Sequence, residues 1–155
     1  QAATMFEGSP QDNILPKIAK AVVNYRIHPR DSVGRVVQRV TNVIADANVR
    51  VALLKGGLLS EPSRVSSVEG PGFDVIRRSI LRVFGEIIVA PGLFIAATDS
   101  RHYAKVADQI YRFHPIRLRT TDRMRIHGTN ERIRVENFRE TVTFYGEVIK
   151  RGSRR

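Results

Sequence analysis

Four histidines are the side chains best suited to metal or acid–base chemistry in this sequence of 155 residues: His28, His102, His114 and His127. A catalytic zinc ion takes about three protein ligands and a structural one about four. The sequence has no HExxH or HxH motif and no cysteine that could add a thiolate. Spacing alone therefore predicts no metal site. An exposed or hydrogen-bonded histidine is the simpler interpretation of His28 and His114, which each precede a proline.

Two polar segments that adjoin apolar ones are better candidates for a binding site. His127 opens the irregular polar segment 127–131, and binding residues concentrate on loops that a rigid scaffold holds. Residues 98–101 directly follow an apolar run, and ligands of α/β sheets bind beyond the carboxyl ends of strands. An arginine beside Thr and Ser can receive a carboxylate there. On these residues alone, a surface histidine and an ordinary turn stay open as alternatives.

The charge and the apolar runs bear on possible partners. The net charge of +11 would suit an acidic partner such as nucleic acid. The arginines are spread over many segments, however, and only 7% of residues are aromatic, so solvated helix faces explain most of the charge. No GxGxxG or GxSxG motif is present. No apolar run approaches the roughly 18 residues needed to span a bilayer, and the start lacks a signal-peptide pattern. These features favour a soluble, cytoplasmic protein without membrane contact.

Hydrophobic periodicity predicts the elements of the first segment. An apolar stretch at 2–6 and residues 19–27 are expected to be strands. Apolar residues from Val33 to Ala47 recur at the spacing of an amphipathic helix. Residues 49–54 are then expected to form a third strand. The order strand, strand, helix, strand predicts a two-layer α+β sandwich.

The second segment begins after a stretch rich in Ser, Gly and Pro at 58–72. A helix is expected to start at Pro71, and a final helix is expected to place Phe138 and Ile149 on one apolar face. Three apolar runs between these helices are expected to be strands: 87–90, 93–97 and 110–118. The overall prediction is an α/β fold with the order helix, strand, strand, helix in this segment, and a domain boundary between residues 66 and 67.

Three motifs in series resemble the M20 metallopeptidase family. The letters NILP at 13–16, followed by VVNYRIHP at 22–29, resemble the family's lid, or dimerisation, domain. ATDSRHY at 97–103 resembles a loop of its catalytic domain, and IHGTNERI at 126–133 resembles the segment before its C-terminal helix. RFHP at 112–115 is close to the version in carboxypeptidase S-like members, which include N-acyl-amino-acid hydrolases and aminoacylases. The resemblance covers nearly the whole chain.

This resemblance implies the C-terminal part of an enzyme in which two zinc ions hydrolyse a peptide or N-acyl amino acid amide bond. Residues 1–66 would then be a partial lid domain and residues 67–155 part of the catalytic domain. The positions that match functional residues of the family are Asn13, Arg26, Thr98, Asp99, Ser100 and Arg101 for substrate binding, His127 for the metal, and Asn130 and Glu131 as its support. Asn13 and Arg26 would reach the substrate's carbonyl and carboxylate.

Several family motifs are missing from the sequence. It contains no His-x-Asp motif and no Glu-Glu pair, which in the family supply metal ligands and the general base. One imidazole cannot hold two metal ions, so we expect the isolated chain to be inactive, and whether it is an enzyme by itself stays open. Lid domains of the family pair edge to edge, which predicts a homodimer through residues 1–66. The alternatives are a stand-alone dimerisation or binding module and, less favoured, a nucleic-acid-binding protein.

Overall fold

The computed structural model describes residues 1–57, 59–94 and 96–153. They form two compact units. The first comprises Gln1–Val65 with the short stretch that ends at Thr98, and the second comprises Ser66–Phe94 with the rest of the chain from Asp99. The assignment of these parts to a lid and a catalytic domain stays a prediction. Within the described residues, no helix has the length and apolar character needed to cross a membrane.

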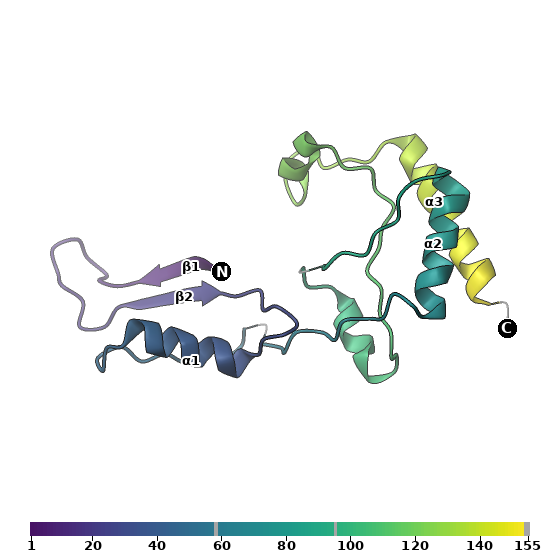
Figure 1. Cartoon of the computed structure of the whole chain (residues 1–155). Coiled ribbons are helices and arrows are strands. Elements are labelled where there is room, and N and C mark those ends of the chain that lie inside the picture. The colour runs from purple at the N-terminus through teal and green to yellow at the C-terminus, as the bar shows by residue number, and fades with distance from the viewer. Residues whose placement is uncertain (58, 95, 154–155) are drawn as a thin grey trace. The chain divides into compact units, whose positions relative to one another are not determined.

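An antiparallel hairpin opens the first unit (Figure 1). It consists of β1 (Ala2–Glu7) and β2 (Lys20–Asn24), with Ala3 opposite Val23 and Phe6 opposite Ala21. The register shifts between Ala3 and Met5, and the Thr4 hydroxyl in the resulting bulge donates to the Val22 carbonyl at 3.3 Å. The strand expected at 19–27 is therefore confirmed in a shorter form.

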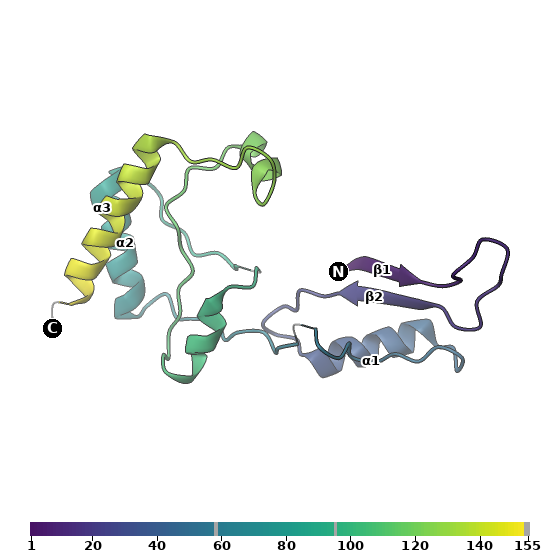
Figure 2. The same cartoon turned by 180° about the vertical axis from the view of Figure 1, so that it is seen from behind.

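The helix of the first unit, α1 (Val33–Ile44), follows the hairpin along the chain (Figures 1 and 2). The Ser32 hydroxyl caps its start by accepting the Arg35 backbone N–H at 3.2 Å. Ala45, in the left-handed region at φ 47°, ends it. The predicted helix is thus confirmed. It ends before Ala47 because Ala45 adopts a left-handed backbone conformation that cannot continue an α-helix.

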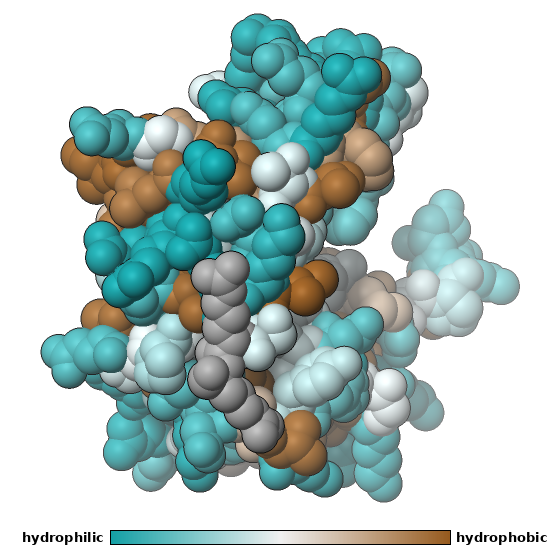
Figure 3. All heavy atoms as spheres, turned by 90° about the vertical axis from the view of Figure 1, so that its right-hand side faces the viewer, coloured by the Kyte–Doolittle hydropathy of each residue, from teal (hydrophilic) through white to brown (hydrophobic). Residues whose placement is uncertain are grey.

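Two packed helices carry the core of the second unit. They are α2 (Pro71–Phe84) and α3 (Val135–Gly152), and both were expected from periodicity. Among the described residues, the buried apolar side chains include Ile80 and Phe144. Buried Ser79 and Thr141 donate to carbonyls of their own helices, at Val75 and Asn137. The face of the molecule seen in Figure 3 is largely hydrophilic, with separate hydrophobic patches.

Two short 3-10 helices complete the second unit: η1 (Asp99–Lys105) and η2 (Thr120–Arg125). In η2, the Asp122 carboxylate accepts the Arg119 backbone N–H and pairs with the Arg125 guanidinium, both at 2.9 Å. The backbone hydrogen bond from Arg119 is the main cause that holds the pKa of Asp122 below its usual value. Burial opposes this lowering, and the nearby arginine charges add to it. Local hydrogen bonds therefore stabilise η2.

The mixed α/β class is confirmed, but several expected strands are not. Residues 49–54, 87–90 and 110–118 are not strands in the structure. The run 93–97 includes residue 95, which lies outside the described residues, and its other members are not in strands either. A strand needs a neighbour to receive its backbone hydrogen bonds, and the described residues provide none for these runs. Ile88, expected to be covered, is 96% exposed.

Candidate functional site

The predicted substrate loop forms η1. Asp99 is exposed, whereas Ser100 and Arg101 are half-buried. The Arg101 Nε donates to the His102 Nε2 at 3.2 Å, and the Ser100 hydroxyl accepts from the Arg112 Nε at 2.6 Å. Thr98, also predicted for this loop, precedes η1 and groups with the first unit. The loop thus forms a defined helical turn, and a hydrogen bond joins it to Arg112 in the segment that follows η1.

The predicted metal ligand lies in a strained turn. His127 has φ 58° and Asn130 has φ 62°, both in the left-handed region that residues other than glycine seldom adopt. The Glu131 carboxylate accepts the His127 backbone N–H at 3.1 Å, so it braces the turn through the main chain. Between them, Gly128 leaves little room, since a Cβ there would lie 3.1 Å from the Met124 carbonyl oxygen. The turn therefore presents an exposed imidazole on a closely specified backbone.

The remaining predicted substrate residues lie in the first unit. Asn13 occupies an exposed turn between β1 and β2. Arg26 lies two residues after the end of β2 at Asn24. The predicted site residues accordingly belong to separate local structures, in both units of the chain.

The described residues do not form a zinc site by themselves. No group of three His, Asp or Glu side chains in the described ranges could hold a metal ion. His127 offers one imidazole, whereas zinc in proteins takes three or four protein ligands. The donor set for two metals would need further residues.

Residues 109–117, most of which the sequence predicted to form a strand, take part in several side-chain hydrogen bonds of the second unit. We call residues 109–117 the strap. At its start, the Ser66 hydroxyl donates to the Ile110 carbonyl and accepts the Ile110 N–H, each at 2.8 Å. The Ser67 N–H donates to the Gln109 side-chain oxygen, and the Tyr111 hydroxyl donates to the Ser67 carbonyl, each at 2.6 Å. Paired bonds of this kind fix both the position and the direction of the strap.

The middle of the strap rests on α3 through its rings. Phe113 meets Phe144 edge-on, with ring centroids 5.2 Å apart, and His114 meets Tyr145 at 5.9 Å. Pro115 is buried beside them. The RFHP motif, which resembles carboxypeptidase S-like proteins, is therefore a packing motif in this structure, and His114 serves as a ring contact.

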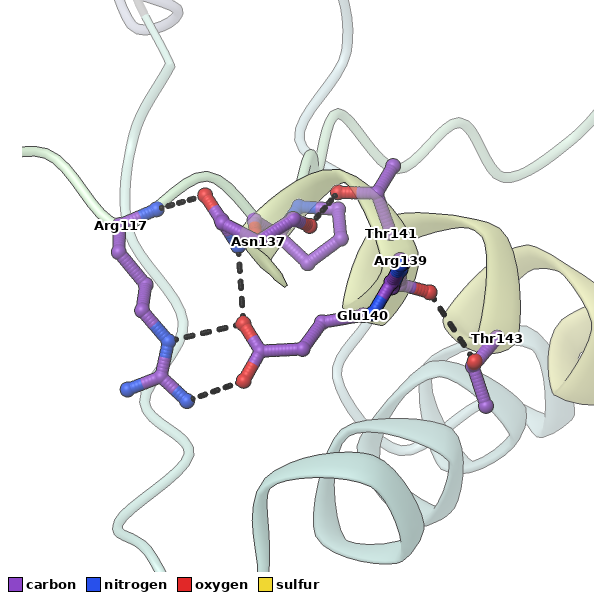
Figure 4. Close-up of polar contacts among 7 residues, drawn as sticks. Arg117, Asn137, Arg139, Glu140, Thr141 and Thr143 are labelled. Carbon is purple, nitrogen blue, oxygen red and sulfur yellow. Dashed lines mark hydrogen bonds and ion pairs between the residues drawn. The ribbon is translucent and has the colours of Figure 1, made fainter. Parts of the chain in front are cut away.

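A hydrogen-bonded network ties the end of the strap to α3 (Figure 4). The buried Asn137 amide donates to the Pro115 carbonyl at 2.9 Å and to the Glu140 carboxylate at 3.0 Å, and its oxygen accepts the Arg117 N–H at 2.9 Å. The Arg117 guanidinium makes two bonds to Glu140, at 2.9 and 2.7 Å, and lies 5.2 Å from the Phe84 ring centroid. The network thus links the strap to both helices.

Charge and hydrogen bonding shift the pKa values of Arg117 and Glu140. The hydrogen bond from Arg117 is the main cause that holds the pKa of Glu140 below its usual value, and Asn137 adds to it. Glu140 in turn raises the pKa of Arg117. Sequence reasoning missed Asn137, which lies four residues before Thr141 and seven before Phe144, on the face that α3 buries. A polar residue at a core position is a signal for such a network.

The groove between α2 and α3 contains none of the predicted site residues. Its lining is Arg82, Val83, Glu136, Arg139, Glu140, Thr143 and Glu147. It adjoins the Arg117–Glu140 pair and carries both signs of charge. It therefore belongs to the structural network.

Comparison with known proteins identifies relatives along almost the whole chain. No family model and no solved structure matches. The chain is 36% identical over 149 residues to "Probable carboxypeptidase S-like 2" of Dictyostelium discoideum, covering 96% of this chain and 28% of that protein. It is 36% identical over 152 residues to the human "N-fatty-acyl-amino acid synthase/hydrolase PM20D1", covering 96% and 30%. With "Carboxypeptidase S" of Saccharomyces cerevisiae it shares 25% identity over 180 residues, covering 96% and 31%.

The chain spans about a third or less of the length of these relatives. The resemblance to carboxypeptidase S-like proteins of the M20 family, predicted from the motifs, is confirmed by them.

Proposed function

From its homology with carboxypeptidase S-like and N-fatty-acyl-amino acid synthase/hydrolase proteins, we propose that this chain is part of a hydrolase that cleaves peptide or N-acyl amino acid amide bonds. The observation that carries the proposal is the similarity over 96% of the chain to proteins with these names. Both substrate classes share an amide beside a carboxylate. A site for them needs a cationic receptor and a donor to the carbonyl oxygen.

The chain offers side chains of both kinds. Arg26 and Arg101 would receive the substrate carboxylate, because a guanidinium presents paired donors in the plane that a carboxylate occupies. Asn13 would donate to the carbonyl oxygen as negative charge develops on it. Thr98, Asp99 and Ser100 would belong to a loop that lines the substrate pocket. These roles are supported by the positions' match to the family motifs.

For the metal, we propose that His127 supplies one ligand to zinc in a complete enzyme with two zinc ions, and that Asn130 and Glu131 support it. The hydrogen bond from the His127 backbone N–H to Glu131 favours this role, because it fixes the turn that carries the imidazole. The 155 residues alone would be inactive, since they contain no His-x-Asp motif and no Glu-Glu pair.

We also propose that the first unit forms a homodimer. Its sheet has two strands in the described residues, β1 and β2, so each of them presents an edge. Such edges pair readily with another chain. Light scattering coupled to size exclusion should give twice the chain mass of 17.5 kDa at micromolar concentration. A monomer mass at all concentrations would contradict this part of the proposal.

A graft tests the proposed hydrolase function. The aligned region of human PM20D1 would be replaced by this chain, and the product assayed for hydrolysis of an N-fatty-acyl amino acid. We expect turnover by the graft and none by the isolated chain. A graft that folds with the circular dichroism and melting behaviour of the parent but has no turnover would contradict the proposal. Turnover by the isolated chain with bound zinc would contradict its expected inactivity.

A further inference from the structure

A short hydrogen bond links the strap to η1. The Arg112 Nε donates to the Ser100 hydroxyl at 2.6 Å, and both residues are half-buried. η1 has no buried residue of its own, and 3-10 helices have poorer hydrogen-bond geometry than α-helices. Its order must therefore depend strongly on side-chain ties to the rest of the unit.

The backbone on both sides of Arg112 is held firmly. On one side, Tyr111 bonds to the Ser67 carbonyl at 2.6 Å. On the other, Phe113 packs on Phe144, and the Pro115 carbonyl accepts from Asn137 at 2.9 Å. An arginine on such a backbone presents its Nε in a defined direction, because fewer of its rotamers fit.

We propose that Arg112 is a positioning residue that couples the strap, and through it α3, to the conformation of η1. Its guanidinium holds the Ser100 hydroxyl, and this contact fixes the turn that carries Asp99 and Arg101. Where η1 contacts the carboxylate end of an N-acyl amino acid, this inference rests on the proposed function. The coupling itself does not, since it concerns the order of η1 without any ligand.

Hydrogen exchange of the ligand-free chain tests the coupling. At labelling times from milliseconds to seconds, R112M should speed exchange of amides in residues 99–105 by about 10-fold, the effect expected for loss of a charge-assisted bond. S100A should do the same, and R112M in the S100A background should add little further. R112K, which keeps a cationic donor, should restore part of the protection. The matched control is R123M, at an exposed arginine of η2.

The pattern of exchange separates positioning from general stabilisation. We expect amides of α2 and α3 to keep their protection in S100A, which removes only a hydroxyl group. Unchanged exchange of residues 99–105 in S100A would overturn the proposal, and so would an equal increase throughout the second unit. If R112M does not fold, S100A alone decides between these outcomes.

The grafted enzyme distinguishes this inference from the proposed function. If the graft is active, R112M in it should raise KM for the N-acyl amino acid several-fold more than it lowers kcat, because the carboxylate receptor is displaced. A change in kcat with constant KM would contradict the link from Arg112 to binding. If the graft is inactive while S100A and R112M loosen residues 99–105, the proposed function fails and the coupling stands.

Discussion

Asn137 is a residue of the second unit on which several polar contacts converge. Its amide joins the Pro115 carbonyl, the Arg117 N–H and the Glu140 carboxylate, while the side chain is almost fully buried. A buried amide with three satisfied bonds has few substitutes, because shorter side chains leave its partners unpaired. The ordering of the end of the strap, at Pro115 and Arg117, therefore depends strongly on this position.

Replacing Asn137 should destabilise the chain. Asn137→Ala should lower the free energy of unfolding by about 2–3 kcal/mol, since it leaves buried or half-buried groups without partners. Thr143→Ala is the control, because the Thr143 hydroxyl is exposed and bonds only to the Arg139 carbonyl in its own helix. Urea unfolding followed by circular dichroism measures both. Equal midpoints for the two variants would show that the network contributes nothing.

The Arg117–Glu140 pair predicts a dependence of stability on pH. The pKa of Glu140 is lowered in the folded state, so its contribution is full above the ordinary glutamate pKa of 4.5 and is lost as pH falls through the lower folded value. Wild type should therefore exceed Glu140→Gln in stability at pH 7, and the difference should shrink as the solution is made more acidic. Urea midpoints along a pH series measure it. A difference that grows in acid would contradict this account.

At the scale of elements, the apolar spacing of the sequence predicted the helices, which local interactions stabilise. The helices from Val33, Pro71 and Val135 follow from apolar spacing. The spacing did not give the buried face of the last helix, since Phe138 and Ile149 are 56% and 69% exposed. The strands expected at 49–54 and 87–90 fail because a strand depends on a partner whose presence the run itself does not record.

In the candidate site, too, the sequence predicted local segments but not the contacts that depend on the folded chain. Motif letters predicted roles for particular segments, including RFHP and the turn that contains His127. They did not predict the left-handed backbone of His127 and Asn130, nor the bond from Arg112 to Ser100. The left-handed conformation of His127 and Asn130 depends on strain that the surrounding structure must offset. The bond from Arg112 to Ser100 joins residues that only the folded chain brings together.

The contact between the strap and α2 has a sharp test at Gly72. A Cβ there would lie 2.8 Å from the Tyr111 Cε2, and the Tyr111 ring is held by its bond to Ser67. Gly72→Ala should cost about 1–3 kcal/mol of unfolding free energy, as overpacking does elsewhere. Gly146→Ala in α3 has open space around its Cβ and should instead stabilise by about 0.5–1 kcal/mol. Thermal unfolding of the pair checks the sign of each change. If both variants were more stable than wild type, the Tyr111 ring would not lie against Gly72 as described.

At the scale of the whole molecule, little apolar surface is buried in either unit. Val43 and Ile149 are 78% and 69% exposed on their helices, and Phe144 is among the few fully buried side chains described. Stability should therefore be concentrated at the contact between α2 and α3 and be small elsewhere.

Two phenylalanines of α3 test that concentration. Phe144 is 2% exposed and Phe138 is 56% exposed. Phe144→Ala should cost about 3–5 kcal/mol, enough to unfold the second unit if its stability is at the low end for small domains. Phe138→Ala should change stability by less than about 1 kcal/mol. Chemical denaturation distinguishes them, and similar losses for both would mean that the α2–α3 contact is not the main core.

The relatives give the molecule its functional context. The chain corresponds to about a third or less of proteins named as carboxypeptidases and N-fatty-acyl-amino acid synthase/hydrolases. Its predicted substrate residues are divided between two units, and its predicted metal residue has no partner ligands within the described part. Both features agree with a piece of a larger catalytic structure.

The most direct test of the hydrolase proposal is zinc content and turnover of the PM20D1 graft with and without His127. The account predicts that the graft binds about two zinc ions and hydrolyses an N-fatty-acyl amino acid, as expected for a two-metal site. His127→Ala should reduce turnover by about 100-fold or more and release zinc, whereas His114→Ala should keep the metal, because His114 is a ring contact to Tyr145. Full zinc content and turnover in His127→Ala would contradict the assignment of this chain to the metal site.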